Sequence, residues 1–168
     1  MNMKTLVIDV NVFVDTEIWS FAQKAPVREK FEDELEYKKF SKAHVKAKKF
    51  LKRILVEEII YMSLHQVAEI FHVLGFRGYK LPIDFVVGYV NDLLLSERVV
   101  KIPVTVSHVK EALKLSKESG IHVWDFLCII PIKEYIDVIY TVDKHFLHET
   151  FQKLGIKIEN PLKIWIKV

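Results

Sequence analysis

Four acidic side chains lie in apolar stretches of this sequence, where an unpaired carboxylate costs free energy. Asp9 and Asp143 each follow a short run rich in Val and Ile. Glu69 lies in a mostly apolar helical stretch, and Asp125 lies at the start of another. A helix cap would explain Asp125 alone, and a lysine partner would explain Glu69 alone. Together the four acids predict an oxygen-rich site for Mg²⁺ or Mn²⁺, because these hard cations prefer carboxylate ligands.

Alternating strands and helices must position these acids. Strands are predicted at residues 4–8, 58–62, 99–103, 138–142 and 157–159, with helices between them. These strands lack the in–out alternation of a half-exposed sheet, so we expect an α/β fold with a mostly parallel sheet of four or five strands, covered on both faces. Ligands bind beyond the carboxyl ends of such strands. Asp9 and Asp143 are therefore expected to face one crevice, where a cation relieves their repulsion.

The composition is that of an ordinary globular domain. The chain has 168 residues, of which 51% are apolar and 28% are charged, so we expect a single domain spanning residues 1–168. Its one cysteine, Cys128, cannot form an internal disulfide. No apolar run approaches the length of about 18 residues that a membrane span needs, and the N-terminal apolar stretch is too short for a signal peptide. We therefore expect a cytoplasmic protein with no membrane partner.

Residues 38–53 hold eight basic side chains and no acidic one, although the net charge of the whole chain is only +3. Apolar residues recur in this segment at steps of three and four, which predicts an amphipathic helix with a basic outer face. A solvated surface is the usual meaning of such a run. Contact with nucleic-acid phosphates is the second interpretation. Like charges four residues apart on a helix repel each other, and binding of phosphate would explain why the sequence tolerates them. The side chains predicted to make this nucleic-acid contact are Lys38, Lys42, Lys46, Lys49 and Arg53.

The acids and their neighbours form four short motifs whose order resembles that of a known family. The motifs are Asp9-x-Asn11 after the first strand, Glu69 on a helix that follows Ser63, Asp125-Phe126-Leu127 at a helix start, and Thr141-x-Asp143-x-x-Phe146 after a late strand. In order and spacing, over about residues 4–159, the sequence resembles the PIN domain. One departure is Val10, which stands where the family often has Thr or Ser.

This resemblance implies a three-layer α/β/α sandwich and a metal-dependent ribonuclease that cleaves single-stranded RNA. It also implies the residues of the site, with Asp9, Glu69, Asp125 and Asp143 binding Mg²⁺ or Mn²⁺ and with Asn11 and Thr141 as supporting polar groups. Many PIN domains are the toxin half of VapBC toxin–antitoxin pairs, and many form dimers. The implied partners are therefore an antitoxin protein and a second copy of the chain.

Two other functions fit parts of the pattern. A PIN-like fold can bind RNA or a protein without cutting, and four acids do not by themselves establish activity. A phosphatase could use a strand-end Asp9 as its nucleophile, but the haloacid-dehalogenase pattern has a second Asp where this chain has Asn11. Binding of a divalent metal distinguishes the nuclease from the binding module, and a covalent phospho-aspartate would identify the phosphatase.

Overall fold

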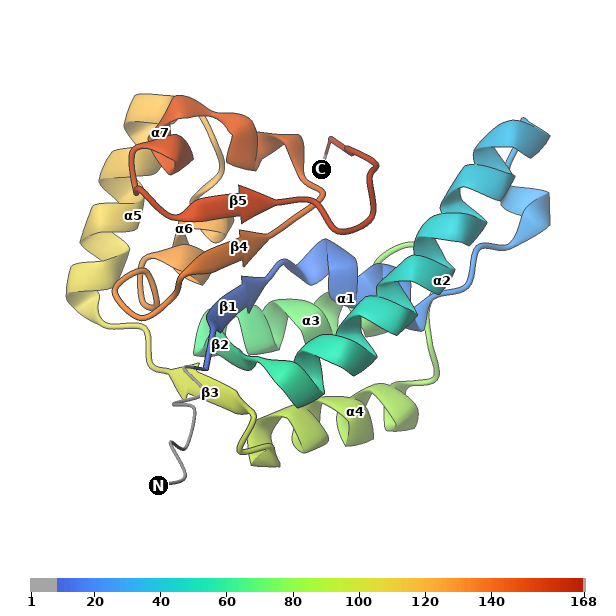
Figure 1. The fold of residues 1–168 in the computed structure, drawn as a ribbon, viewed down its shortest axis with the longest axis horizontal. Coiled ribbons are helices and arrows are strands. Elements are labelled where there is room, and N and C mark those ends of the chain that lie inside the picture. The colour runs from blue at the N-terminus through green and yellow to red at the C-terminus, as the bar shows by residue number, and fades with distance from the viewer. Residues whose placement is uncertain (1–8, 168) are drawn as a thin grey trace, which may run out of the picture.

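A parallel sheet forms the centre of the computed structural model, which describes residues 9–167 (Figure 1). Its strands are β1 (Asn11–Val14), β2 (Ile59–Ser63), β3 (Val99–Ile102), β4 (Val138–Tyr140) and β5 (Lys157–Glu159). The strands lie in the order β3-β2-β1-β4-β5, and each neighbouring pair is parallel. The predicted parallel sheet is confirmed, with five strands.

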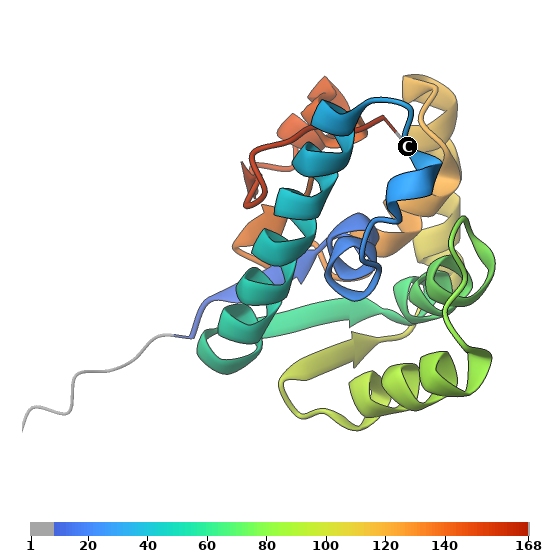
Figure 2. The same ribbon diagram turned by 90° about the vertical axis from the view of Figure 1, so that its right-hand side faces the viewer.

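Helices cover both faces of this sheet, so the predicted three-layer sandwich is also confirmed (Figures 1 and 2). The helices are α1 (Thr16–Gln23), α2 (Glu34–Glu57), α3 (Leu64–Phe76), α4 (Ile83–Leu95), α5 (Val106–Ser119), α6 (Val123–Ile129) and α7 (Glu149–Gln152). Two 3-10 turns, η1 (Arg28–Lys30) and η2 (Lys144–Leu147), complete the described elements. In the described part of the chain, no helix combines the length and the apolar character needed to cross a bilayer.

The side chains of β1 alternate between two apolar cores. Val12 and Val14 pack into the core on the side of α1 to α4, whereas Phe13 packs into the core on the side of α5 to α7. All three side chains are fully buried. Each burial stabilises the fold by roughly 1.5–3 kcal/mol, and a shift of the strand by one residue would exchange the two faces. Burial on both faces explains why the strand has a continuous apolar sequence rather than an alternating one.

Helix α2 contains the whole predicted basic helix and runs along one flank of the molecule (Figure 2). The Asp33 side chain caps its first turn by accepting a hydrogen bond from the Leu35 backbone N–H, with an Oδ1–N distance of 2.9 Å. Its apolar side, which includes Ala47 and Ile54, is fully buried in the core. The amphipathic helix expected from the three- and four-residue spacing is therefore present, with its lysines on the outer side.

The first strand of the described residues lies further along the chain than the first strand that the sequence pattern predicts. The predicted strand at residues 4–8 falls outside the described residues, and β1 begins at Asn11. Asn11 pairs with Ile59 of β2, and Val12 pairs with Val138 of β4. Consequently Asp9 precedes the amino end of β1, where it is exposed, and does not follow the carboxyl end of a described strand. The residue that leaves the carboxyl end of β1 is Asp15.

Candidate metal centre

An acidic cavity of about 480 Å³ opens at the carboxyl ends of β1 and β4. Its wall is formed by the start of α1, one side of α3, the first turn of α6 and the segment after β4. The lining residues are Asp15, Glu17, His65, Ala68, Glu69, His72, Val73, Arg77, His122, Trp124, Asp125 and Asp143. Five carboxylates thus meet in the crevice where an open parallel sheet binds ligands.

Asp15 is held at the floor of this cavity and is only 6% exposed. The Thr141 hydroxyl donates a hydrogen bond to its carboxylate, with an Oγ1–Oδ2 distance of 2.7 Å. Burial raises the pKa of Asp15 well above its ordinary value, against the lowering effect of this hydrogen bond. The negative charges of Glu17, Asp125 and Asp143 raise the pKa further. Asp15 is therefore a buried acid that shares one electrostatic environment with the other carboxylates of the cavity.

Thr141 also connects Asp15 to Asp143. Its Oγ1 accepts a hydrogen bond from the Asp143 backbone N–H at 3.0 Å. The Asp143 Oδ1 in turn accepts a hydrogen bond from the His145 backbone N–H at 2.9 Å, which caps η2. One hydroxyl thus holds both the Asp15 carboxylate and the backbone that carries Asp143, because both of its hydrogen-bonding directions are used.

Asp125 and Asp143 influence each other's ionisation. Burial, followed by the negative charge of Asp143, raises the pKa of Asp125 to about 7. Burial also raises the pKa of Asp143, against lowering contributions from the backbone and the ring of His145. Two carboxylates that resist ionisation for this reason will ionise readily beside a bound cation.

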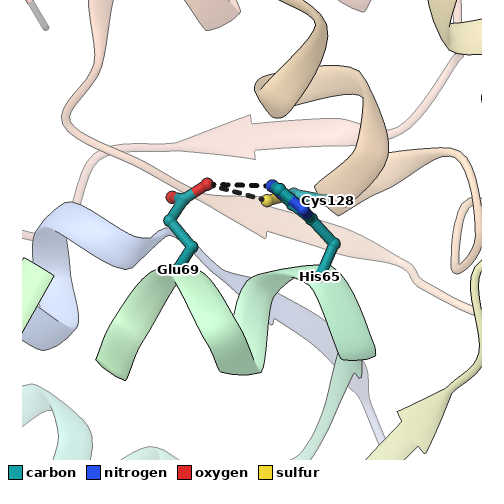
Figure 3. Close-up of side chains that lie close together, drawn as sticks. All are labelled: His65, Glu69 and Cys128. Atoms are coloured by element: carbon teal, nitrogen blue, oxygen red, sulfur yellow. Dashed lines mark hydrogen bonds and ion pairs between the residues drawn. The ribbon is translucent and has the colours of Figure 1, made fainter. Parts of the chain in front are cut away.

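Glu69 completes the group from α3, where its side chain lies beside His65 and Cys128 (Figure 3). His65 lies one turn earlier on α3, with its Nε2 atom 3.3 Å from Glu69 Oε2, and the Cys128 thiol donates to the same oxygen at 3.7 Å. Burial alone would raise the pKa of Glu69, but contacts with His65 and with the Thr16 hydroxyl outweigh burial and lower it. The Glu69 carboxylate is thus ionised over a wider pH range than its partners.

The chemistry of this donor set fits a divalent cation. The one lysine or arginine among the lining residues is Arg77, and it forms an ion pair with Glu17. Asp15, Glu69, Asp125 and Asp143 have no such partner among the lining residues, and burial without compensating charge is costly for a carboxylate. Hard cations such as Mg²⁺ and Mn²⁺ compensate such a cluster through oxygen ligands.

The structure brings together four of the six residues expected at the metal site, namely Glu69, Asp125, Asp143 and Thr141, and corrects the placement of Asp9 and Asn11. Asn11 opens β1 at the opposite end of the strand, where its backbone N–H donates to Asp137 Oδ2 at 3.0 Å. Asp9 lies in the exposed stretch before it. The physical reason is that the second apolar run, which forms β1, pairs with both β2 and β4.

Two acids of the cavity, Asp15 and Glu17, are not among the residues predicted from the sequence. The sequence does contain a sign of Asp15. The PIN-domain pattern often has Thr or Ser directly after its first Asp, and Thr16 directly follows Asp15, whereas Val10 follows Asp9. Thr16 is buried beside the cavity, at the start of α1. Glu17 gave no such signal, because an acid in the first turn of a helix is common on solvated surfaces.

The predicted RNA-binding side chains lie outside this cavity. Lys38, Lys42 and Lys46 line a separate groove on α2, together with Lys163 near the C-terminus. This groove and the acidic cavity share no lining residue. Lys49 and Arg53 continue the basic side of α2 toward its C-terminal end, where Arg53 pairs with Glu57 at 3.5 Å. Their contact with RNA stays a prediction.

The fold and the cavity together define an α/β protein with an acidic centre at the carboxyl edge of a parallel sheet. No family model and no curated protein matches the sequence. Among solved structures, the chain is similar to VapC20 of Mycobacterium tuberculosis, a toxin that cleaves the sarcin–ricin loop. The identity is 18%, 81% of this chain and 92% of that chain are covered, and the TM-score is 0.59.

Two toxin–antitoxin structures show the same likeness. The first is FitAB bound to a DNA fragment, which is 14% identical to this chain. The match covers 92% of this chain and 98% of the FitAB chain, with a TM-score of 0.55. VapBC2 of Rickettsia felis, bound to a promoter DNA fragment, is 14% identical, with 90% and 98% covered and a TM-score of 0.51. The chain therefore has the PIN fold that its sequence resembles. At sequence identities of 14–18%, these likenesses establish the fold alone.

Proposed function

We propose that this chain is a divalent-metal-dependent endoribonuclease that cleaves single-stranded RNA. The observation that carries this proposal is the convergence of four carboxylates in one cavity of a PIN fold, with no lysine or arginine partner among the lining residues. The proposed ligands of Mg²⁺ or Mn²⁺ are Asp15, Glu69, Asp125 and Asp143. Asp15 takes the role that the sequence resemblance gave to Asp9.

The chain's own residues would prepare the site for a phosphodiester. Thr141 positions two of the carboxylates, and the pair formed by Arg77 and Glu17 borders the cavity without neutralising the four acids. The divalent ion, when bound, supplies charge stabilisation at the phosphate oxygens and activates water for in-line attack. Without a cation the acids repel the negatively charged RNA backbone, so the residues that hold the metal also control access of the substrate.

Trp124 offers a surface for a nucleobase at the rim of this cavity. Its side chain is 55% exposed, and its ring stacks on His65 with a centroid separation of 5.4 Å and an interplanar angle of 7°. Stacking on an aromatic ring binds unpaired bases with little sequence preference. The predicted RNA contacts on α2 would then hold the flanking backbone, because lysines attract phosphate over a distance of about one Debye length.

We further propose that the chain is the toxin of a toxin–antitoxin pair and forms homodimers. The likeness to FitAB and VapBC2 supports an antitoxin partner for the fold. Exposed apolar side chains also gather where α3 ends and α4 begins, among them Phe76, Tyr79, Ile83 and Phe85. Large apolar groups exposed together are typical of surfaces that bind another protein.

Cleavage of a single-stranded RNA in Mg²⁺ or Mn²⁺ tests the proposed activity. We expect EDTA to abolish cleavage and Asp15→Asn to reduce it by about 100-fold or more, because a lost ligand costs at least as much as a lost outer-shell partner. Asp9→Asn is the matched control, since it makes the same chemical change in an exposed residue outside the cavity. Cleavage that survives EDTA, or equal losses in the two variants, would contradict the proposal.

The alternative of a binding module that does not cut predicts a different result. RNA would then bind with similar affinity in EDTA and in Mg²⁺, and no product would appear with either metal. The pKa shifts of the cavity favour the nuclease, because acids that only decorate an RNA-binding surface would be solvated rather than buried.

A further inference from the structure

Two histidines lie on one side of the acidic cavity, although they come from different parts of the sequence. His122 is the residue before α6, and His145 is in η2, two residues after Asp143. Their rings meet edge to face, with centroids 4.7 Å apart. Both rings therefore present nitrogen atoms to the same small volume, on the side of the cavity formed by α6 and η2.

Asp125 lies between these histidines. Its Oδ2 atom is 3.1 Å from His145 Nδ1 and 3.6 Å from His122 Nδ1. One ligand atom from each of the three residues lies within 4.8 Å of the other two. A tetrahedral ion with bonds of about 2.0–2.1 Å to nitrogen and oxygen holds its ligands roughly 3.3–3.4 Å apart. The observed spacing is thus already close to that of a coordination shell.

We propose that His122, Asp125 and His145 form a binding site for a first-row transition-metal ion such as Zn²⁺ or Co²⁺. Two imidazoles and a carboxylate suit these ions, whereas Mg²⁺ prefers oxygen ligands alone. Asp143 is placed to be the fourth ligand, because its Oδ2 is 3.6 Å from His145 Nδ1. The cavity then has an oxygen side, with Asp15 and Glu69, and a histidine side that selects a different ion.

A second trio, His65, Glu69 and Cys128, has similar spacing but is a poorer site. Zinc-class ions bind cysteine as the thiolate. Cys128 is fully buried, and burial together with the charge of Glu69 raises the pKa of its thiol well above the ordinary value. The thiol keeps its proton and donates to Glu69 (Figure 3). The trio around Asp125 contains no thiol, so no buried cysteine has to lose its proton before a metal can bind there.

Sharing of ligands gives this site a consequence for RNA cleavage, and that consequence rests on the proposed function. Asp125 and Asp143 belong both to the histidine side and to the four carboxylates of the proposed Mg²⁺ site. An ion on the histidine side competes for these oxygens. We therefore expect Zn²⁺ to inhibit Mg²⁺-dependent cleavage, and we expect this inhibition to be lost when His122 is replaced.

Direct metal binding tests the site without any RNA. The full chain, stripped with a chelator and dialysed, is titrated with Co²⁺ in a large excess of Mg²⁺, while visible absorption reports nitrogen ligands. We expect one Co²⁺ per chain, with Zn²⁺ displacing it. His122→Ala and His145→Gln should each weaken binding by about 100-fold or more. His72→Ala is the matched control, because His72 lines the same cavity outside the trio.

Three outcomes would overturn the inference. One is the absence of Co²⁺ binding in excess Mg²⁺, which is expected if His145 only forms ion pairs with Asp125 and Asp143. Another is an equal loss of affinity in the His72 variant. The third is loss of binding in His65→Ala with no change in His122→Ala. Thermal melts of each variant separate lost ligands from lost folding, and His122→Ala is the safest substitution, because this side chain is 46% exposed.

The same experiments keep this inference separate from the proposed function. A protein that binds Co²⁺ through the histidines but cuts no RNA contradicts the nuclease alone. A protein that cuts RNA with Mg²⁺ but shows no nitrogen-ligated Co²⁺ contradicts the histidine site alone. Glu69→Gln adds a further check, because we expect it to reduce cleavage while the Co²⁺ spectrum persists.

Discussion

Replacing Asp125 by Asn should stabilise the metal-free protein at alkaline pH, although it removes a proposed ligand. The folded chain holds the Asp125 proton more tightly than the unfolded chain, because burial and Asp143 raise its pKa from 3.8 to about 7. The contribution of Asp125 to the free energy of unfolding is therefore fully present below about pH 4, and it is lost as the pH rises through about 7. Asn cannot ionise, so the variant does not suffer this loss.

The magnitude follows from the size of the shift. A change of one pKa unit corresponds to about 1.36 kcal/mol, so the full shift sets a ceiling of about 4 kcal/mol at pH 8. Burial also raises the pKa of the neighbouring Asp143, and the charge cost is shared between the two carboxyl groups. We therefore expect Asp125→Asn to raise the free energy of unfolding at pH 8 by about 2 kcal/mol, with little gain at pH 4.

Urea unfolding in the presence of EDTA, at pH 4 and at pH 8, measures this difference. The matched control is Asp9→Asn, which should change the free energy of unfolding by less than about 0.5 kcal/mol at either pH, as an exposed substitution does. Mn²⁺ should stabilise the native chain at pH 8 more than at pH 4 and should stabilise Asp125→Asn much less. If Asp125→Asn is destabilised at pH 8 in EDTA, Asp125 is held by a favourable ion pair with His145, and the reasoning from repulsion is refuted.

Three further predictions concern the support of the site and its contact with RNA. Thr141→Val should lower the free energy of unfolding by about 1–3 kcal/mol, since two buried carboxylate positions lose their shared hydroxyl; urea unfolding at pH 6 measures it, and no change would contradict it. Trp124→Ala should raise the KM for single-stranded RNA and leave kcat nearly constant, whereas a fall in kcat alone would exclude a stacking role. Reversing Lys38, Lys42 and Lys46 to Glu should reduce the slope of log affinity against log salt by at least about 2, and an unchanged slope would leave the basic side of α2 as a solvated surface.

The sequence was sufficient to predict the architecture, because β-rich apolar runs alternate with amphipathic stretches and the runs show no in–out pattern. It was also sufficient for Glu69, Asp125 and Asp143 as candidates, since each lies in or beside an apolar element. It was insufficient for the first strand, because two apolar runs in succession each end in an aspartate, at Asp9 and at Asp15. The second run pairs with β2 and β4, and such pairing between distant segments cannot be read from the local pattern of either run.

The histidine side of the cavity was beyond the reach of the sequence for a related reason. His122 and His145 are separated by a helix and a strand, and their spacing along the chain matches no metal-binding motif. They meet because α6 begins, and η2 follows β4, at the same edge of the sheet. Local periodicity can place a residue on a face of one element, but it cannot show that two such faces lie 4.7 Å apart.

The distribution of charge argues that a bound cation is needed for any phosphate chemistry in this cavity. The lysines of α2 line a different groove, and Arg77 is already paired with Glu17, so neither neutralises the four carboxylates. An RNA strand attracted by α2 would therefore still meet a negative surface at Asp15 and Asp125. Acids whose pKa values are raised by burial and by neighbouring carboxylates become ionised as a cation binds, and the same event would remove the barrier to the phosphodiester. In the proposed nuclease, metal binding and substrate binding would thus be coupled through the same side chains, and the metal would have to bind before the RNA.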